Sequence, residues 1–152
     1  MADGITVNVH IDERALQAKL DNLLDKKTML EVHNALARYC EPYVPMQSGL
    51  LATTHQVTPD FVRYYLPYAH YQYTGDVYGP NIPIKDKDGN IVGFFSPPGQ
   101  KKHPTGAQLK YSTEMHPRAS KEWDKAMMAD NGQAFIEEVK RILVERAREL
   151  YG

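Results

Sequence analysis

The sequence predicts an α+β fold: a small, mainly antiparallel sheet packed against N-terminal and C-terminal helices, with a protruding β-hairpin arm. Three observations lead to this prediction. Apolar residues recur at helical spacing near both ends of the chain. The middle third is rich in β-branched and aromatic residues separated by turn sequences. Residues 76–106 are rich in proline and glycine, which is typical of an excursion from a compact core.

Length and composition favour one ordinary domain covering residues 1–152, with 42% hydrophobic and 24% charged residues. Lysine and arginine number 18 against 19 acidic residues, so the net charge of −1 provides no general attraction for nucleic acid or anionic lipid. The single cysteine, Cys40, excludes an internal disulfide. No apolar run is long enough to form a membrane-spanning helix, and the N-terminus lacks the pattern of a signal peptide. We therefore expect a chain that is soluble and cytoplasmic at synthesis.

The N-terminal third predicts one strand and two helices. Residues 5–11 alternate apolar and polar side chains, as in a half-buried strand. Asp12 can cap a helix, and Thr28 with Glu31 forms a capping-box pair for a second helix, which Pro42 then ends. The first helix carries an apolar stripe that must be covered, made of Leu16, Leu20, Leu23 and Leu24.

The middle third predicts a β-hairpin of residues 50–57 and 61–66 around the turn at Thr58–Asp60. A short helix over residues 68–73 follows and ends at Gly75. Residues 76–106 are expected to form the arm, in which residues 82–84 and 91–95 pair around an Asp-Gly-Asn turn. Its apolar residues favour a surface that becomes buried against a partner.

The C-terminal third predicts a third core strand over residues 108–113 and a helix that Ser120 caps and that contains Trp123. Residues 130–132 interrupt that helix. The closing helix is strongly amphipathic, with one apolar stripe made of Phe135, Val139, Ile142, Leu143, Ala147 and Leu150.

The pattern of reactive side chains predicts no catalytic, cofactor or metal site. The six histidines show no paired ligand spacing, and no glycine-rich phosphate loop is present. His33 and Cys40 are two helical turns apart, about 10 Å, which is too far to share one ion. Asp86, Asp88 and Asn90 resemble part of a calcium loop, but a polar hairpin turn explains them better.

Six tyrosines between residues 64 and 78 are the most unusual feature of the composition. Tyrosine is enriched at protein interfaces, and it also fills small cores, and both interpretations stay open here. Stacking on single-stranded nucleic acid would require Lys101, Lys102, His103 and Lys110 to form one surface with the tyrosines. The residues we expect at an interface are Tyr68, Tyr71, Tyr73, Tyr78, Ile82, Ile84, Ile91, Phe94 and Phe95.

Two motifs carry a family resemblance. Residues 44–51 read VPMQSGLL and residues 68–75 read YAHYQYTG. In this order, and followed by Pro117-Arg118, Trp123 and a long amphipathic helix, they resemble the minor capsid and neck proteins of tailed phages. The resemblance covers most of residues 12–150 and extends to the HK97 gp10-like head-tail joining group.

This resemblance implies a structural virion protein and not an enzyme. Copies would form a ring in the neck, with connector, head-completion and tail proteins as partners and DNA only as passing cargo. The protein would assemble in the host cytoplasm and end in the virion neck, and residues 80–98 would lie on the next subunit. Tail completion in the same region is the alternative function; a nucleic-acid binding module and a small enzyme using Cys40 are the other classes.

Overall fold

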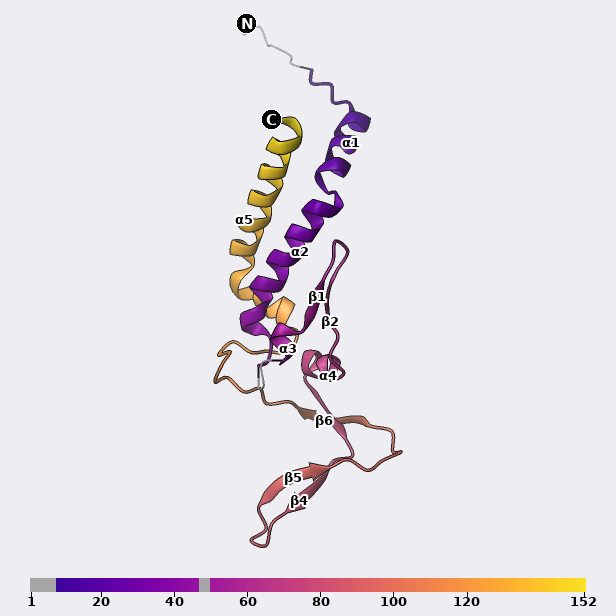
Figure 1. Ribbon diagram of the computed structural model, residues 1–152, viewed down its shortest axis with the longest axis vertical. Helices are drawn as coiled ribbons and strands as arrows, with labels where there is room; N and C mark the ends of the chain where they lie inside the picture. Colours follow the sequence, from indigo (N-terminus) through magenta and orange to yellow (C-terminus); the bar gives the residue numbers. More distant parts are fainter. Residues whose placement is uncertain (1–7, 47–49) are drawn as a thin grey trace, which may run out of the picture.

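The computed structural model describes residues 8–46 and 50–152 (Figure 1). The molecule is elongated, with a pair of long helices at one end, a β-hairpin at the other, and the buried core between them (Figure 1). Helices, short antiparallel ladders and the protruding hairpin confirm the predicted α+β class.

Two N-terminal helices follow one another along the long axis. Helix α1 (Glu13–Leu23) begins at Asp12, whose carboxylate accepts the backbone N–H groups of Arg14 and Ala15, as predicted. Helix α2 (Lys26–Cys40) begins earlier than predicted, because its cap lies three residues before Thr28. Its cap is Asp25, which accepts the N–H of Thr28, so Thr28 lies inside the helix and is fully buried. A 3-10 turn, η1 (Glu41–Tyr43), then ends the segment.

The predicted N-terminal strand is absent over Asn8–Ile11, which are exposed and outside any strand; residues 5–7 lie outside the described residues. No strand of this chain lies beside Asn8–Ile11 in the described ranges, so the alternating pattern has no ladder to join.

Helix α5 (Trp123–Tyr151) runs antiparallel to α2 and packs along it (Figure 1). The ring of Tyr39 meets that of Phe135 edge-on at 5.6 Å, and Arg38 pairs with Glu138 at 3.1 Å. The predicted interruption is a kink, because only Asn131 departs from helical angles.

The predicted N-cap of the helix that contains Trp123 was wrong. The N-cap is Glu122, in the left-handed conformation at φ 45°, and not Ser120. The N–H of Ser120 instead donates to the carbonyl of Tyr43 at 3.0 Å, which holds Ser120 in the preceding loop.

The middle hairpin is confirmed with shorter strands, β1 (His55–Val57) and β2 (Val62–Tyr64). The first residues of the predicted strand form instead one helical turn, α3 (Leu50–Thr53). Leucine and alanine favour helix, and the turn buries Leu51 and Ala52 in the core.

Helix α4 (Ala69–Thr74) ends at Gly75, as predicted, where φ is 77° and glycine is favoured. Strand β3 (Asp76–Gly79) follows directly and pairs with β6 (His103–Gln108). The third strand therefore lies earlier than the predicted residues 108–113, because its partner β3 begins immediately after α4. Strands β4 (Ile82–Lys85) and β5 (Ile91–Phe95) form the predicted hairpin arm.

The strands form three separate two-stranded ladders in the described residues, β1–β2, β3–β6 and β4–β5, in place of one sheet. Helix α4 separates the first ladder from the second, so the helices do not cover a common sheet face. The core gathers instead around Trp123 and consists of Cys40, Tyr43, Val44, Leu51, Ala52, Ala69, Trp123 and Met127.

Candidate protein interface

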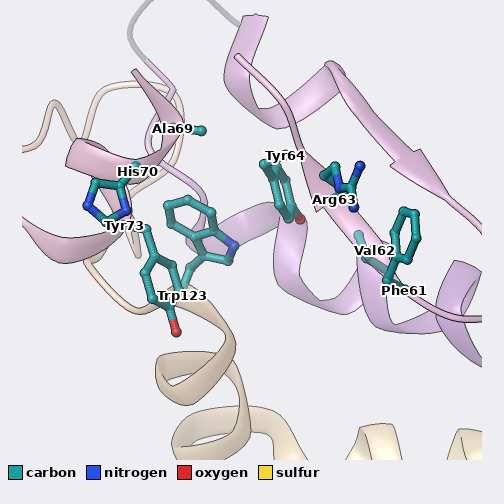
Figure 2. Close-up of a pocket in the computed structure, with 8 residues that line it drawn as sticks. All are labelled: Phe61, Val62, Arg63, Tyr64, Ala69, His70, Tyr73 and Trp123. Atoms are coloured by element: carbon teal, nitrogen blue, oxygen red, sulfur yellow. The ribbon is translucent and has the colours of Figure 1, made fainter. Parts of the chain in front are cut away.

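An aromatic groove opens beside strand β2. Figure 2 shows Tyr64 from β2 and Tyr73 from α4 on either side of Trp123, the first residue of α5. Both tyrosine rings meet the indole edge-on, with centroids 5.1 and 5.0 Å away. The groove has a volume of about 450 Å³ and is lined by Phe61, Val62, Arg63, Tyr64, Ala69, His70, Tyr73 and Trp123.

The floor of this groove is apolar and tightly held. Trp123 is 4% exposed, and the hydroxyl of Tyr73 donates to Asp124 at 2.8 Å. Burial raises the pKa of Tyr64 above its ordinary range, and burial together with Asp124 raises the pKa of Tyr73 to about 12. Both phenols therefore stay neutral at physiological pH, and the floor can receive apolar groups.

The rim of the groove is polar. Arg63 is exposed, and its guanidinium lies 4.4 Å from the centroid of the Phe61 ring, in a cation–π arrangement. His70 is also exposed and stands on the α4 side (Figure 2). A groove with an apolar floor and a polar rim has the layout of a protein contact.

The tyrosine-rich stretch divides between the two interpretations that the sequence left open. Tyr64 and Tyr73 pack on Trp123 and complete the core. Tyr68 and Tyr71 are 38% and 39% exposed, and the Tyr71 ring lies 4.7 Å from that of Tyr78. Tyr68, Tyr71 and Tyr78 thus retain free surface for a partner, while Tyr73 faces the groove.

The arm exposes most of its apolar side chains. Ile82 pairs with Phe95 and Pro83 with Phe94, and residues opposite each other share a face, so both faces of the hairpin carry large apolar groups. The exposed fractions range from 47% to 65% for Ile82, Ile84, Ile91, Val92, Phe94 and Phe95. An isolated two-stranded hairpin is at best marginally stable in water, so this arm is suited to docking on another surface.

The tip of the arm is ordered by Asp86. Its carboxylate accepts the N–H groups of Asp88 and Asn90, both at 2.9 Å, and the side-chain amide of Asn90 at 3.2 Å. These bonds, chiefly the one from the Asn90 backbone, lower the pKa of Asp86. The acidic cluster is therefore a hairpin turn, as predicted from the sequence.

A second apolar surface follows α1. None of its residues is buried, and Leu16, Leu20 and Leu24 are 42% to 50% exposed. The end of α5 reaches α1, where the hydroxyl of Tyr151 donates to the carbonyl of Lys19. The predicted stripe is therefore left largely uncovered by the described parts of the chain.

The geometry around Cys40 shows no activated nucleophile. Burial is the main cause that raises the pKa of its thiol to about 11, so the thiolate is scarce at neutral pH. His33 lines the same 350 Å³ cavity, but its Nδ1 lies 2.9 Å from the carbonyl oxygen of Thr58. The second histidine that an enzyme site with Cys40 would require does not line this cavity.

The basic residues named with the tyrosines lie at the two ends of strand β6. Lys110 lines a hollow with Tyr68, whereas Lys102 precedes β6 and bonds Asn81 at 3.2 Å. Strand β6 lies between the two lysines and separates them by roughly 20 Å. They do not make the single basic surface that nucleic-acid stacking requires.

Residues 8–46 and 50–152 contain neither a membrane-spanning helix nor a cluster of metal ligands. No helix there is long and apolar enough to cross a membrane. No group of three potential metal ligands occurs in the same ranges.

The groove was not anticipated from the sequence, because β2, α4 and α5 contribute its walls from three distant segments. The single tryptophan in a chain with ten tyrosines is the one signal that could have indicated it. The arm, in contrast, was visible as a local pattern of apolar residues around a turn sequence.

Of the comparisons with known proteins, the family comparison gives a match. No curated protein and no solved structure is significantly similar to the chain. A family model described as minor capsid protein matches residues 5–143, which is nearly the whole chain and includes both motifs, the arm and the groove. The chain therefore belongs to the minor capsid protein family and is a structural protein of a phage virion.

Proposed function

We propose that this minor capsid protein is a component of the neck of a tailed phage, in the head-tail joining group. Copies form a ring between the portal and connector proteins and the tail tube. The order of the VPMQSGLL and YAHYQYTG motifs supports this position, as does the arrangement of exposed apolar surfaces at the two ends of an elongated molecule.

The observation that carries the proposal is the arm. A ring requires heterologous contacts, in which one surface of each copy meets a different surface of the next. The hairpin of residues 80–98 projects from the body and exposes apolar side chains on both faces (Figure 1). In the ring, this arm lies on the neighbouring subunit and buries those side chains.

The proposed position in the neck also determines which proteins the ring contacts and what passes through it. Connector, head-completion and tail proteins contact the two ends of the ring, and DNA passes through its centre. A net charge of −1 suits a passage for DNA, because a strongly basic lining would retain the phosphates.

The ring is tested by light scattering across concentration. The wild-type chain is expected to reach a ring-sized mass, and a chain in which a short Gly-Ser linker replaces residues 81–96 is expected to stay monomeric. Asp88→Ala, at the polar tip, is the matched control and should assemble like the wild type. An unchanged oligomer after arm deletion would overturn the role of the arm.

The position in the virion is tested by deleting the gene from its phage or prophage and imaging the lysate. A neck protein predicts DNA-filled heads beside unattached tails of normal length. Tails of irregular length would indicate tail completion instead, and intact virions would contradict both functions.

A further inference from the structure

The N-terminal segment, residues 5–11, has a strand pattern, and its described part, Asn8–Ile11, lies in no strand. Ile5, Val7, Val9 and Ile11 alternate with Thr6, Asn8 and His10. In the described part, Val9 is 80% and Ile11 61% exposed, and Asn8–Ile11 leave α1 away from the rest of the molecule (Figure 1). As a strand, a segment with this pattern would present one apolar face and a backbone that can pair.

A suitable partner edge lies on β2. At the end of its hairpin, the N–H of Thr58 donates to the carbonyl of Phe61 at 2.9 Å. Hydrogen-bonded pairs alternate along an antiparallel ladder, so Gln56 and Arg63 form the next such pair. The N–H and C=O groups of Val62 and Tyr64 therefore point away from β1, to an edge that no other described strand covers.

The aromatic groove follows this open edge. Four consecutive residues, 61–64, line it, although alternate side chains of a strand leave opposite faces. A groove that touches all four must therefore run along the strand, with α4 as its other wall (Figure 2). A strand edge facing a helix across an apolar floor is the geometry by which proteins take up an extended segment as an additional strand.

The segment cannot reach this groove in its own molecule. Thr58, at the tip of the β1–β2 hairpin, contacts His33, and helical rise places His33 about 30 Å from Asp12 along α1 and α2. The seven residues of the segment span at most about 24 Å when extended. The groove of a second copy has no such restriction.

We propose that the N-terminal segment of one copy adds as a strand to the β2 edge of another copy, with its apolar face in the Trp123 groove. The Val62 and Tyr64 backbone groups then acquire partners, and Val7 and Val9 are buried against the aromatic floor. The inference deepens the proposed ring, on which it rests for the presence of neighbouring copies, and identifies a second contact distinct from the arm.

The fluorescence of Trp123 reports directly on binding in the groove, because Trp123 is the only tryptophan and forms the groove floor. The acceptor is the full-length chain carrying Val7→Asp and Val9→Asp, which cannot fill its neighbour's groove. A synthetic peptide of residues 4–12, which contains no tryptophan, is expected to change Trp123 emission saturably. Phe61→Ala in the acceptor removes a groove wall and should weaken binding about tenfold, whereas Tyr65→Ala, outside the groove, should not.

Backbone methylation separates strand pairing from simple apolar binding. One peptide is N-methylated at residues 7 and 9 and another at residues 6, 8 and 10. Strand addition uses the N–H groups of alternate residues, so one of these peptides must lose binding while the other retains it. The proposal is overturned if the unmodified peptide leaves Trp123 emission unchanged, or if both methylated peptides bind as tightly as the unmodified one.

The same contact is tested in the assembled protein by light scattering. Val7→Asp with Val9→Asp should reduce association, and the matched control, Thr6→Asp with Asn8→Asp on the opposite face, should not. Peptide binding is read on a single acceptor chain and does not depend on ring closure. A chain that binds the peptide but forms no ring would therefore contradict the ring alone.

Discussion

The core around Trp123 and the arm of residues 80–98 use similar side chains in opposite ways. In the core, Tyr64 and Tyr73 pack edge-on against the indole, and Met127 is fully buried. In the arm, Phe94 and Phe95 are at least half exposed, although they are as apolar as any core residue. Apolar surface buried within the chain stabilises the monomer, whereas apolar surface left exposed on a projecting hairpin can be stabilised only by another molecule.

The largest effect on monomer stability is expected from the core. Met127→Ala removes a fully buried side chain and should lower the free energy of unfolding by about 2–5 kcal/mol. Met128→Ala is the matched control, because the neighbouring side chain is 44% exposed and should cost far less. Thermal and denaturant unfolding followed by circular dichroism measure both. Equal losses would show that the core is not centred where the structure places it.

The second-largest loss of monomer stability is expected from a substitution at the junction between the core and the arm. Gly75 ends α4 at a φ of 77°, so Gly75→Ala places a side chain in the left-handed region at a cost of about 1–2 kcal/mol. The added Cβ would also lie 3.1 Å from the Tyr111 hydroxyl. Gly93→Ala, in the arm, meets no atom within 4 Å and is expected to be nearly neutral. A neutral Gly75→Ala, measured in the same unfolding experiment, would contradict the left-handed cap.

A smaller, pH-dependent effect is expected where α2 meets α5. The N–H of Thr28, and then the guanidinium of Arg146, lower the pKa of Asp25 to about 2. Because this folded value lies below the unfolded value of about 4, the stabilisation is present above pH 4 and is lost as the pH falls towards 2.

Asp25→Asn isolates this charge, since asparagine can still cap the helix. The variant should melt at a temperature that changes less between pH 5 and pH 2 than that of the wild type. If the melting temperatures of the variant and the wild type change equally between pH 5 and pH 2, the Asp25 charge does not contribute to folding stability.

The smallest effect on the monomer is expected in the arm. Ile82→Ser with Phe95→Ser changes two opposite and exposed residues of one face. The free energy of unfolding of the monomer should move by no more than about 0.5 kcal/mol. The same variant should lose self-association in sedimentation experiments, and Pro83→Ser with Phe94→Ser tests the other face. A large loss of monomer stability would show that the arm packs on its own body.

Local patterns predicted the elements well. Asp12, Gly75 and the turn at Asp86–Asn90 carry their own conformational signals, so the first helix, the end of α4 and the arm could be predicted from a few neighbouring residues. The caps of α2 and α5 were misplaced, because Asp25 competes with Thr28 for the same role and Ser120 is held by Tyr43 from a distant segment.

The arrangement of the elements in space was harder to predict from the sequence. Helix α4 lies between the first two ladders along the chain and packs on the start of α5 through Tyr73, a contact that no local pattern encodes. The groove has the same origin, since its walls come together only in the folded chain. The alternation in residues 5–11 was interpreted as a strand of this fold, and its described part pairs with nothing in the monomer. The interface residues of the arm remain a prediction.

Hydrogen exchange read by mass spectrometry, at concentrations below and above self-association, tests most directly the claim that the arm is a contact between copies. We expect the backbone amides of residues 82–95 to exchange rapidly in the dilute monomer and to become protected on association. Amides of α2 and α5 should be protected in both states, because these helices are already packed in the monomer. Association that leaves exchange in the arm unchanged would contradict the claim.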